Sequence, residues 1–191
     1  MRLADRVVIV TGGAAGMGLA FASHLLNEGA AIVIADIKDT EPALNALGHS
    51  DRTLGLQTDV SQVASVRSMI KTVFERFGRI DVLINNAGTS STSRLEDLTN
   101  EQLDEDFNLK VKGAIYCTRH ALPYLKDSKG CICNTTTPGG KAPTAGTQPT
   151  ALSRAAGISL TKTWAFEFAA DGIRVNTVCV GFLRSRQHNL R

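Results

Sequence analysis

The sequence lacks the long apolar runs and the charge blocks that mark membrane-spanning or nucleic-acid-binding chains. None of its hydrophobic stretches approaches the roughly 20 residues that cross a bilayer, and its 21 basic and 18 acidic residues are spread along the chain. The N-terminal stretch also lacks the order of a signal peptide, because Asp5 and Arg6 directly precede a short strand pattern. We therefore predict a cytoplasmic protein with no membrane or nucleic-acid partner.

Cysteine is scarce, and its spacing excludes two common kinds of site. The four cysteines, which include no C-x-x-C pair, are Cys117, Cys131, Cys133 and Cys179. No histidine stands at ligand spacing from them, so neither a zinc site nor a redox motif is indicated. The four histidines lie in unrelated contexts, and none is singled out as a catalytic base. We expect reduced, buried thiols and no metal.

The chain instead alternates short apolar runs with longer amphipathic ones, as one domain of 191 residues with 43% hydrophobic content. Strands are predicted at residues 7–10, 31–36, 54–57, 80–85, 131–134 and 173–178. Helical spacing covers residues 16–28, 61–77, 98–126 and 150–170. This alternation predicts an α/β fold, a doubly wound parallel sheet of Rossmann type in three α/β/α layers. The long irregular stretch 135–149 joins a strand to a helix, with Thr150 as the expected N-cap, and a loop of that length is usually functional.

A glycine-rich turn follows the first predicted strand. It reads VIVTGGAAGMG and places Gly12, Gly16 and Gly18 between a strand and a helix. Glycines there let the backbone approach a pyrophosphate, which the helix N-terminus stabilises through its free N–H groups. Asp36 ends the second strand, at about the spacing of the acid that binds an adenosine ribose. Because a carboxylate there repels a 2′-phosphate, the sequence favours NAD over NADP.

Five segments together resemble the short-chain dehydrogenase/reductase family in its NAD-preferring form. They are TGGAAGMG (11–18), Asp36, Asp59 with Val60, NNAG (85–88) and DGIRVNTV (171–178). The resemblance implies that Gly12, Met17 and Gly18 line the pyrophosphate and that Asp36 binds the adenosine ribose. It also implies that Asp59 and Val60 line the adenine, and that Asn86, Ala87 and Gly88 line the inner side of the cofactor.

The same resemblance shows that the catalytic relay of the family is substituted. The family uses a Tyr as acid and base, a Lys four residues later, a Ser that orients the carbonyl and an Asn that supports the relay through water. These positions fall on Thr150, Arg154, Thr137 and Lys110. Asn108 lies two residues from the Asn position, roughly 200° around a helix, and a local shift would be needed to restore it. An aliphatic hydroxyl has a far higher pKa than a phenol, so Thr150 is a poor general acid.

The C-terminal part of the chain also departs from the family pattern. Val180 stands where the family has a Pro, while Leu183 and Ser185 are expected near the nicotinamide amide. The family's domain continues through a seventh strand and helices that cover the substrate, so the single domain 1–191 looks truncated at its C-terminus. We expect an open sheet edge at 175–180, which either a further segment or a partner would cover.

The resemblance further implies assembly, because the family pairs the helices expected at 98–126 and 150–170 across a twofold axis. A set of apolar residues on the second helix favours a homodimer or a higher homo-oligomer: Leu152, Ile158, Trp164, Phe166 and Phe168. The alternative is that these residues belong to the core of one protomer.

Three functions remain open from the sequence. The chain is an NAD-dependent oxidoreductase acting on an alcohol or ketone with a rebuilt relay, or an NAD-binding protein without dehydrogenase activity. The third is a non-redox enzyme in which Lys110 and Arg154 stabilise an oxyanion or hold an anionic substrate. In each case the expected partner is a small molecule, which the sequence does not identify.

Overall fold

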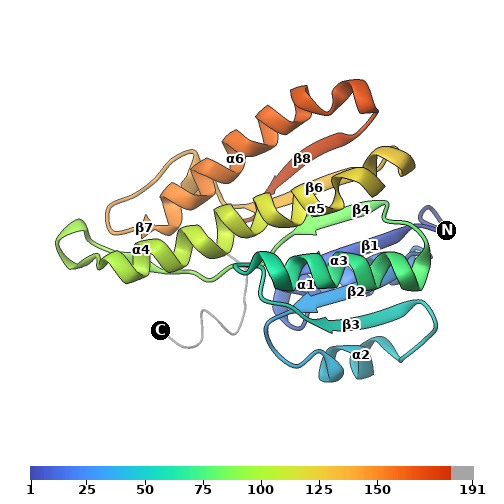
Figure 1. Ribbon diagram of the computed structural model, residues 1–191. Helices are drawn as coiled ribbons and strands as arrows, with labels where there is room; N and C mark the ends of the chain where they lie inside the picture. Colours follow the sequence, from blue (N-terminus) through green and yellow to red (C-terminus); the bar gives the residue numbers. More distant parts are fainter. Residues whose placement is uncertain (182–191) are drawn as a thin grey trace.

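A six-stranded parallel sheet forms the centre of the protein (Figure 1). The computed structural model describes residues 1–181. The strands follow the order β3-β2-β1-β4-β6-β8 across the sheet. Their bounds are β1 Val7–Thr11, β2 Ala31–Asp36, β3 Thr53–Gln57, β4 Val82–Asn85, β6 Cys131–Thr136 and β8 Arg174–Cys179. A separate antiparallel pair joins β5 (Thr92–Ser93) to β7 (Gln148–Pro149). The predicted doubly wound sheet is confirmed.

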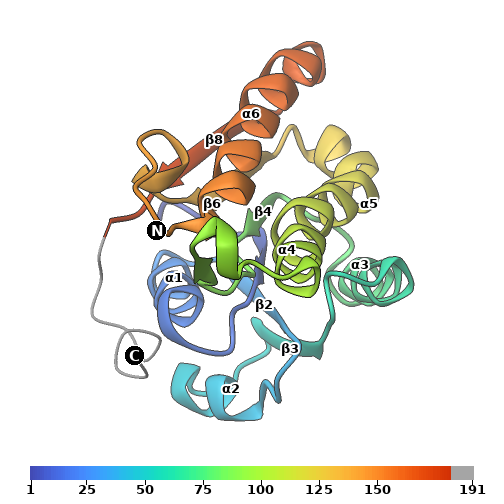
Figure 2. The ribbon, with the colours of Figure 1, turned by 90° about the vertical axis from the view of Figure 1, so that its left-hand side faces the viewer.

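Helices cover both faces of this sheet (Figure 2). Helices α1 and α2 pack on one face, and α3, α5 and α6 pack on the other. The bounds are α1 Gly16–Asn27, α2 Glu41–Leu47, α3 Val63–Phe77, α4 Asn100–Phe107, α5 Gly113–Ser128 and α6 Thr150–Glu167. Short 3₁₀ turns occur at Leu95–Asp97, Pro138–Gly140 and Ala169–Asp171.

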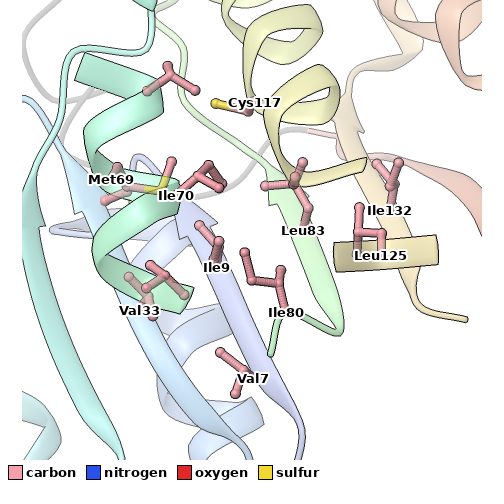
Figure 3. Close-up of a cluster of buried hydrophobic side chains, with 14 of the residues drawn as sticks. Val7, Ile9, Val33, Met69, Ile70, Ile80, Leu83, Cys117, Leu125 and Ile132 are labelled. Atoms are coloured by element: carbon pink, nitrogen blue, oxygen red, sulfur yellow. The ribbon is translucent and has the colours of Figure 1, made fainter. Parts of the chain in front are cut away.

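Successive side chains of each strand point to opposite faces of the sheet, so the apolar core has two parts, one on each face. Val7 and Ile9 of β1 face α3 and α5, whereas Val8 and Val10 face α1. All four side chains are fully enclosed or nearly so. Figure 3 shows the first of these cores, in which side chains of α3 and α5 pack against β1, β2, β4 and β6. Strands that are covered on both faces need continuous apolar sequence, which explains the uninterrupted runs seen in the chain.

The strand order reverses between β1 and β4. From β1 the chain first builds outward through β2 and β3, and then returns to place β4, β6 and β8 on the other side. The connections that follow β1 and β4 therefore leave the sheet in opposite directions. A crevice at the carboxyl ends of such strands is the usual ligand site of open α/β sheets.

Three details differ from the sequence predictions. Helix α2 was missed, and the stretch 98–126, predicted as one helix, contains α4, a π-helical turn at Asn108–Lys112 and α5. Thr150 is the first residue of α6, where the prediction made it the N-cap; its hydroxyl makes no cap to its own helix. Pro149, which pairs with Thr92 in the β5–β7 ladder, takes the cap position.

Strand β8 lies at one end of the sheet within residues 1–181. Val178 on this strand is 48% exposed, and the open edge expected at 175–180 stays a prediction. No helix of the described part is both long and apolar enough to cross a membrane.

Candidate cofactor and active site

The glycine-rich turn between β1 and α1 is shaped by backbone conformations that favour glycine. Gly12 and Gly16 have φ values of 64° and 55°, in the left-handed region that side chains disfavour. A methyl group at Gly18 would collide with the carbonyl oxygen of Gly12. Helix α1 begins at Gly16, and no side chain caps its N-terminus. Its first N–H groups are therefore available to an anion.

Asn86 fastens this turn to the end of β4. Its Nδ2 donates to the carbonyl oxygens of Thr11 and Gly12, at 3.0 and 3.1 Å. In return, Thr11 Oγ1 accepts from the backbone N–H groups of Asn86 and Ala87, at 2.9 and 3.1 Å. The two loops that flank the crevice are thus tied together by four hydrogen bonds.

Asp36 lies at the end of β2, against the glycine-rich turn. One carboxylate oxygen accepts from the backbone N–H of Ala14 and the other from that of Lys38, each at 3.0 Å. The carboxylate is held by backbone groups, and no cation forms an ion pair with it among residues 1–181. These two backbone bonds hold the carboxylate in place without a flexible side-chain partner.

Asp59 and Val60 follow β3 at the same edge of the sheet. Asp59 Oδ1 accepts from the backbone N–H and the hydroxyl of Ser61, at 2.9 and 2.7 Å. Val60 is buried and packs closely against Gly113, where an added methyl group would lie 2.9 Å from Val60 Cγ2. Met17, also expected to line the cofactor, is half-buried in the first turn of α1.

The residues present fit a nicotinamide dinucleotide. Gly16 leaves open space where a side chain would otherwise project, and the uncapped start of α1 offers N–H donors to a pyrophosphate. Asp36 offers two carboxylate oxygens for ribose hydroxyls at the spacing that such a cofactor needs. When bound, the cofactor would supply a hydride donor or acceptor at the inner end of the crevice.

A buried polar cluster lies on the far side of this crevice, between α4 and α6. Lys110 Nζ contacts Asp106 Oδ2 at 2.5 Å and donates to Thr150 Oγ1 at 2.9 Å. The backbone N–H of Ser91 donates to the same hydroxyl at 3.1 Å, and the hydroxyl lies 3.3 Å from Asp106 Oδ2. The side chains of Lys110 and Asp106 are only 2% and 0% exposed. We name these three side chains, Lys110, Asp106 and Thr150, the polar triangle.

The π-helical turn Asn108–Lys112 sets the direction of Lys110. A π turn holds one more residue than an α turn, and it changes which side chains face the neighbouring helix. Lys110 faces Thr150 and is buried, whereas Asn108 is half-buried and makes no hydrogen bond to Thr150 within residues 1–181. The structure thus brings Lys110 to the position next to Thr150.

Arg154 lies one turn further along α6 than Thr150. Its Nη1 donates to the carbonyl oxygen of Thr135 at 2.6 Å, and its Nη2 lies beside Gly88, where an added methyl group would be 3.1 Å away. No carboxylate pairs with Arg154 in the described part of the chain. Burial lowers the pKa of Arg154 below its ordinary value, and Asp106 offsets part of this effect. A methyl group at residue 88 would therefore require the guanidinium to give way by a few tenths of an ångström.

Burial also governs the ionisation of Lys110. It lowers the pKa of the ammonium to about 8, because the charged form loses its solvation. The hydrogen bond from Lys110 to Asp106 opposes this effect, and the charge of Arg154 adds to it. At neutral pH Lys110 is therefore mostly protonated, and it titrates within reach of physiological conditions.

A cavity of about 20 Å³ lies beneath the two cations, with Asn85, Lys110, Thr135 and Arg154 in its lining. Asn85 Oδ1, Thr135 Oγ1 and Arg154 Nε are buried without a hydrogen-bond partner among the described residues. Such a volume with several polar groups matches the needs of one internal water molecule. The space is far too small for a substrate.

Among the described residues, the hydrogen bonds directly join two of the four relay positions, Lys110 and Thr150. Thr137 follows the end of β6 and forms no hydrogen bond with Lys110, Thr150 or Arg154 within residues 1–181. Leu183 and Ser185 lie outside the described residues. Sequence reasoning missed Asp106, although its spacing of four residues before Lys110 is the usual sign of an ion pair on a helix. It also missed the backbone of Ser91, for which the sequence gives no signal.

The reversal of strand order, the glycine-rich turn and the acid at the end of β2 define a Rossmann-type dinucleotide-binding protein. Comparison with known proteins agrees. A model of the short chain dehydrogenase family matches residues 6–189. The chain is 33% identical over 190 residues to the meso-2,3-butanediol dehydrogenase of Serratia marcescens, a match that covers 99% of this chain and 76% of that protein.

Two further relatives point the same way. The 3-oxoacyl-(acyl-carrier-protein) reductase FabG of Thermotoga maritima is 34% identical over 189 residues, covering 97% of this chain and 77% of that protein. The crystal structure of levodione reductase aligns with a TM-score of 0.91 and 28% identity, over 97% of this chain and 75% of that one. The chain therefore belongs to the short-chain dehydrogenase/reductase family, with the family's NAD(P)-binding Rossmann fold.

Proposed function

We propose that this protein binds NAD(H) in preference to NADP(H) and that it oxidises simple alcohols slowly at neutral pH. The observation that carries the cofactor choice is Asp36, whose carboxylate is held against the glycine-rich turn by the N–H groups of Ala14 and Lys38. Ribose hydroxyls can donate to this carboxylate, whereas a 2′-phosphate would be repelled by it.

The slow oxidation follows from the polar triangle. Oxidation of an alcohol needs a base that takes the hydroxyl proton, and Thr150 Oγ1 already accepts from Ser91 and Lys110. A threonine side chain is also shorter than a phenol, so the substrate would have to approach closer to α6. Arg154 still offers N–H donors beside Gly88 for the ribose next to the nicotinamide. Cofactor binding and alcohol turnover are therefore separable in this site.

The geometry disfavours the non-redox alternative in the form that the sequence suggested. That alternative needs two unpaired cations at one oxyanion, but Asp106 neutralises Lys110 at 2.5 Å. Arg154 is then the single unpaired cation of the pair. A protein that binds NAD(H) without any turnover remains the second candidate, because the substituted relay leaves the cofactor half intact.

The test is a titration of the purified protein with NADH and NADPH, followed by an assay of NADH formation over a panel of simple alcohols. We expect NADH to bind at least about tenfold more tightly than NADPH, which corresponds to about 1.4 kcal/mol. Asp36→Ala should narrow this ratio by removing the ribose acceptor and the repulsion together. Asp39→Ala, which removes an exposed acid from the same loop, should leave the ratio unchanged. Equal affinity of the parent for both cofactors would refute the role of Asp36.

A further inference from the structure

The hydrogen bonds of Thr150 limit what its hydroxyl can do. A hydroxyl has one hydrogen to donate and two lone pairs to accept with. Both lone pairs are engaged, one by the backbone N–H of Ser91 at 3.1 Å and one by Lys110 Nζ at 2.9 Å. Thr150 can therefore donate a proton to a substrate, but it has no free lone pair with which to take one.

The hydrogen of Thr150 is also weakly held. Its acceptor is Asp106 Oδ2 at 3.3 Å, which is longer than the roughly 2.5–3.0 Å typical of O–H···O bonds. An incoming oxygen at ordinary distance would compete well for this hydrogen. Thr150 is half-buried, while Lys110 and Asp106 behind it are enclosed. Of the polar triangle, Thr150 is thus the member placed to meet a substrate.

We propose that Thr150 and Lys110 form a proton-donating pair for carbonyl reduction, in which Thr150 Oγ1 protonates the substrate oxygen and Lys110 Nζ reprotonates Thr150. This inference rests on the proposed binding of NADH, the reductant whose hydride forms the new C–H bond at the carbonyl carbon. The O–H bond of Thr150 breaks as the O–H bond of the product forms. One N–H proton of Lys110 moves to Thr150 Oγ1, and the neutral amine regains a proton from solvent afterwards.

These two coupled proton transfers remove the objection to threonine as an acid. An isolated threonine hydroxyl would have to become an alkoxide, with a pKa far above that of a phenol. With Lys110 at 2.9 Å, the proton is replaced as it leaves, and the acid that determines the driving force is the ammonium. Two charged side chains face Lys110: Asp106 from α4 holds the ammonium in its charged form, and Arg154 from α6 disfavours it. The pair therefore favours reduction over oxidation at neutral pH.

The experiment measures single-turnover oxidation of bound NADH by diacetyl and by cyclohexanone as a function of pH. The variants are Thr150→Val, which keeps the shape and loses the hydroxyl, and Thr150→Ser, which keeps the hydroxyl. Because Lys110→Met alone would leave Asp106 as an unpaired buried charge, the lysine is tested in the pair Asp106→Asn with Lys110→Met. NADH affinity is measured for every variant, so that loss of cofactor binding is seen separately.

We expect the parent to reduce at least one carbonyl probe, with a rate that falls as the pH rises through about 8, the pKa of Lys110. Thr150→Val and the double variant should each lower the rate at least about tenfold and abolish its pH dependence. Combining all three substitutions should lower the rate little further, as for groups that act as one unit. Thr150→Ser should retain most of the rate. A merely structural role of Thr150 would leave the pH profile in place.

A second readout does not depend on turnover. The protein is labelled with ¹³C at lysine Cε, and the Lys110 signal is assigned by its absence in the double variant. This signal should titrate with a midpoint near pH 8. Thr150→Val should lower the midpoint, because the charged form of Lys110 loses a hydrogen-bond acceptor. Undiminished reduction by Thr150→Val would overturn the proposal. So would a parent that binds NADH and reduces neither probe. A parent that fails to bind NADH would instead refute the proposed function.

Discussion

Lys110 shows how one substituted side chain changes the chemistry around it. The lysine fills the space beside Thr150 with an ammonium, and the buried Asp106 balances its charge. Burial of an ion pair costs solvation on both sides, and its attraction offsets that cost only with good geometry. The depressed pKa of Lys110 indicates that the charged form is not fully compensated.

This imbalance predicts how stability depends on pH. The folded-state pKa of Lys110 is about 8, against an ordinary value of 10.5, so between these values the unfolded chain binds more protons than the folded one. Stability from this group therefore rises with pH across that window. Relative to the double variant Asp106→Asn with Lys110→Met, the unfolding free energy of the parent should rise by about 2 kcal/mol from about pH 7.5 to about pH 9.5.

Chemical denaturation at a series of pH values measures this difference. Lys71→Met is a suitable control, because Lys71 is exposed and pairs with Glu75 at the surface. Its difference from the parent should stay nearly flat over the same range. A parent whose stability relative to the double variant falls with rising pH would show that burial does not dominate the ionisation of Lys110.

At the scale of elements, the turn between β1 and α1 is the most sharply determined piece of the site. A methyl group at Gly18 would strike the Gly12 carbonyl oxygen, so Gly18→Ala must move either the turn or the helix start. We expect this variant to lose at least about tenfold in NADH affinity, measured by fluorescence titration. Gly139→Ala is the matched control, because its methyl group would lie in ordinary contact, 3.6 Å from Thr137 Oγ1. Unchanged affinity of Gly18→Ala would show that the cofactor does not approach this turn.

The elements also show what the sequence could predict and why it failed elsewhere. All six strands of the main sheet were predicted. For β1, β2 and β4 the signal is a continuous apolar run, because these strands are buried on both faces, whereas β3 and β8 are only partly buried and have a mixed sequence. Helix α2 was missed because seven residues are too short for a clear period. The break within 98–126 was missed because a π turn changes the helical register without any change of composition.

For the site, local signals indicated where the glycine-rich turn and Asp36 lie in the fold, and their binding roles stay predictions. The glycine-rich turn and Asp36 were found from spacing, since backbone conformation at a turn restricts the residue type directly. The polar triangle depends on contacts across 40 residues between Lys110 and Thr150. Thr150 was expected to cap its own helix, but its hydroxyl instead accepts from Ser91 and Lys110. These partners from distant parts of the chain therefore override the local preference of threonine for an N-cap position.

At the scale of the whole molecule, the expected dimer depends on the outer face of α6. Ile158, Trp164 and Phe168 belong to the core of the protomer, so three of the five apolar residues first assigned to an interface are already buried. Phe166 and Leu152, at 87% and 46% exposed, remain on the surface of the helix. A single exposed phenylalanine is common on a protein surface, so the dimer prediction rests on the resemblance to the family and takes Phe166 as its test.

We predict that the parent is a dimer or larger at micromolar concentration and that Phe166→Glu weakens assembly at least about tenfold, because a charge would be buried at the interface. Light scattering over a dilution series measures both. Leu95→Glu places the same charge on another exposed residue, 75% accessible and far from α6 in sequence, and should leave the mass unchanged. A parent that is monomeric throughout would contradict the prediction.

The bonds that join Asn86 to Thr11 and Gly12 have a consequence for the thermodynamics of ligand association. They fix both walls of the crevice while the chain folds, so the conformational entropy of these loops is lost before any ligand arrives. A binding event then carries little additional ordering cost, and more of the intrinsic contact energy remains as affinity. The crevice is therefore preorganised for ligand binding, and this preorganisation does not depend on whether the proton transfer beside it takes place.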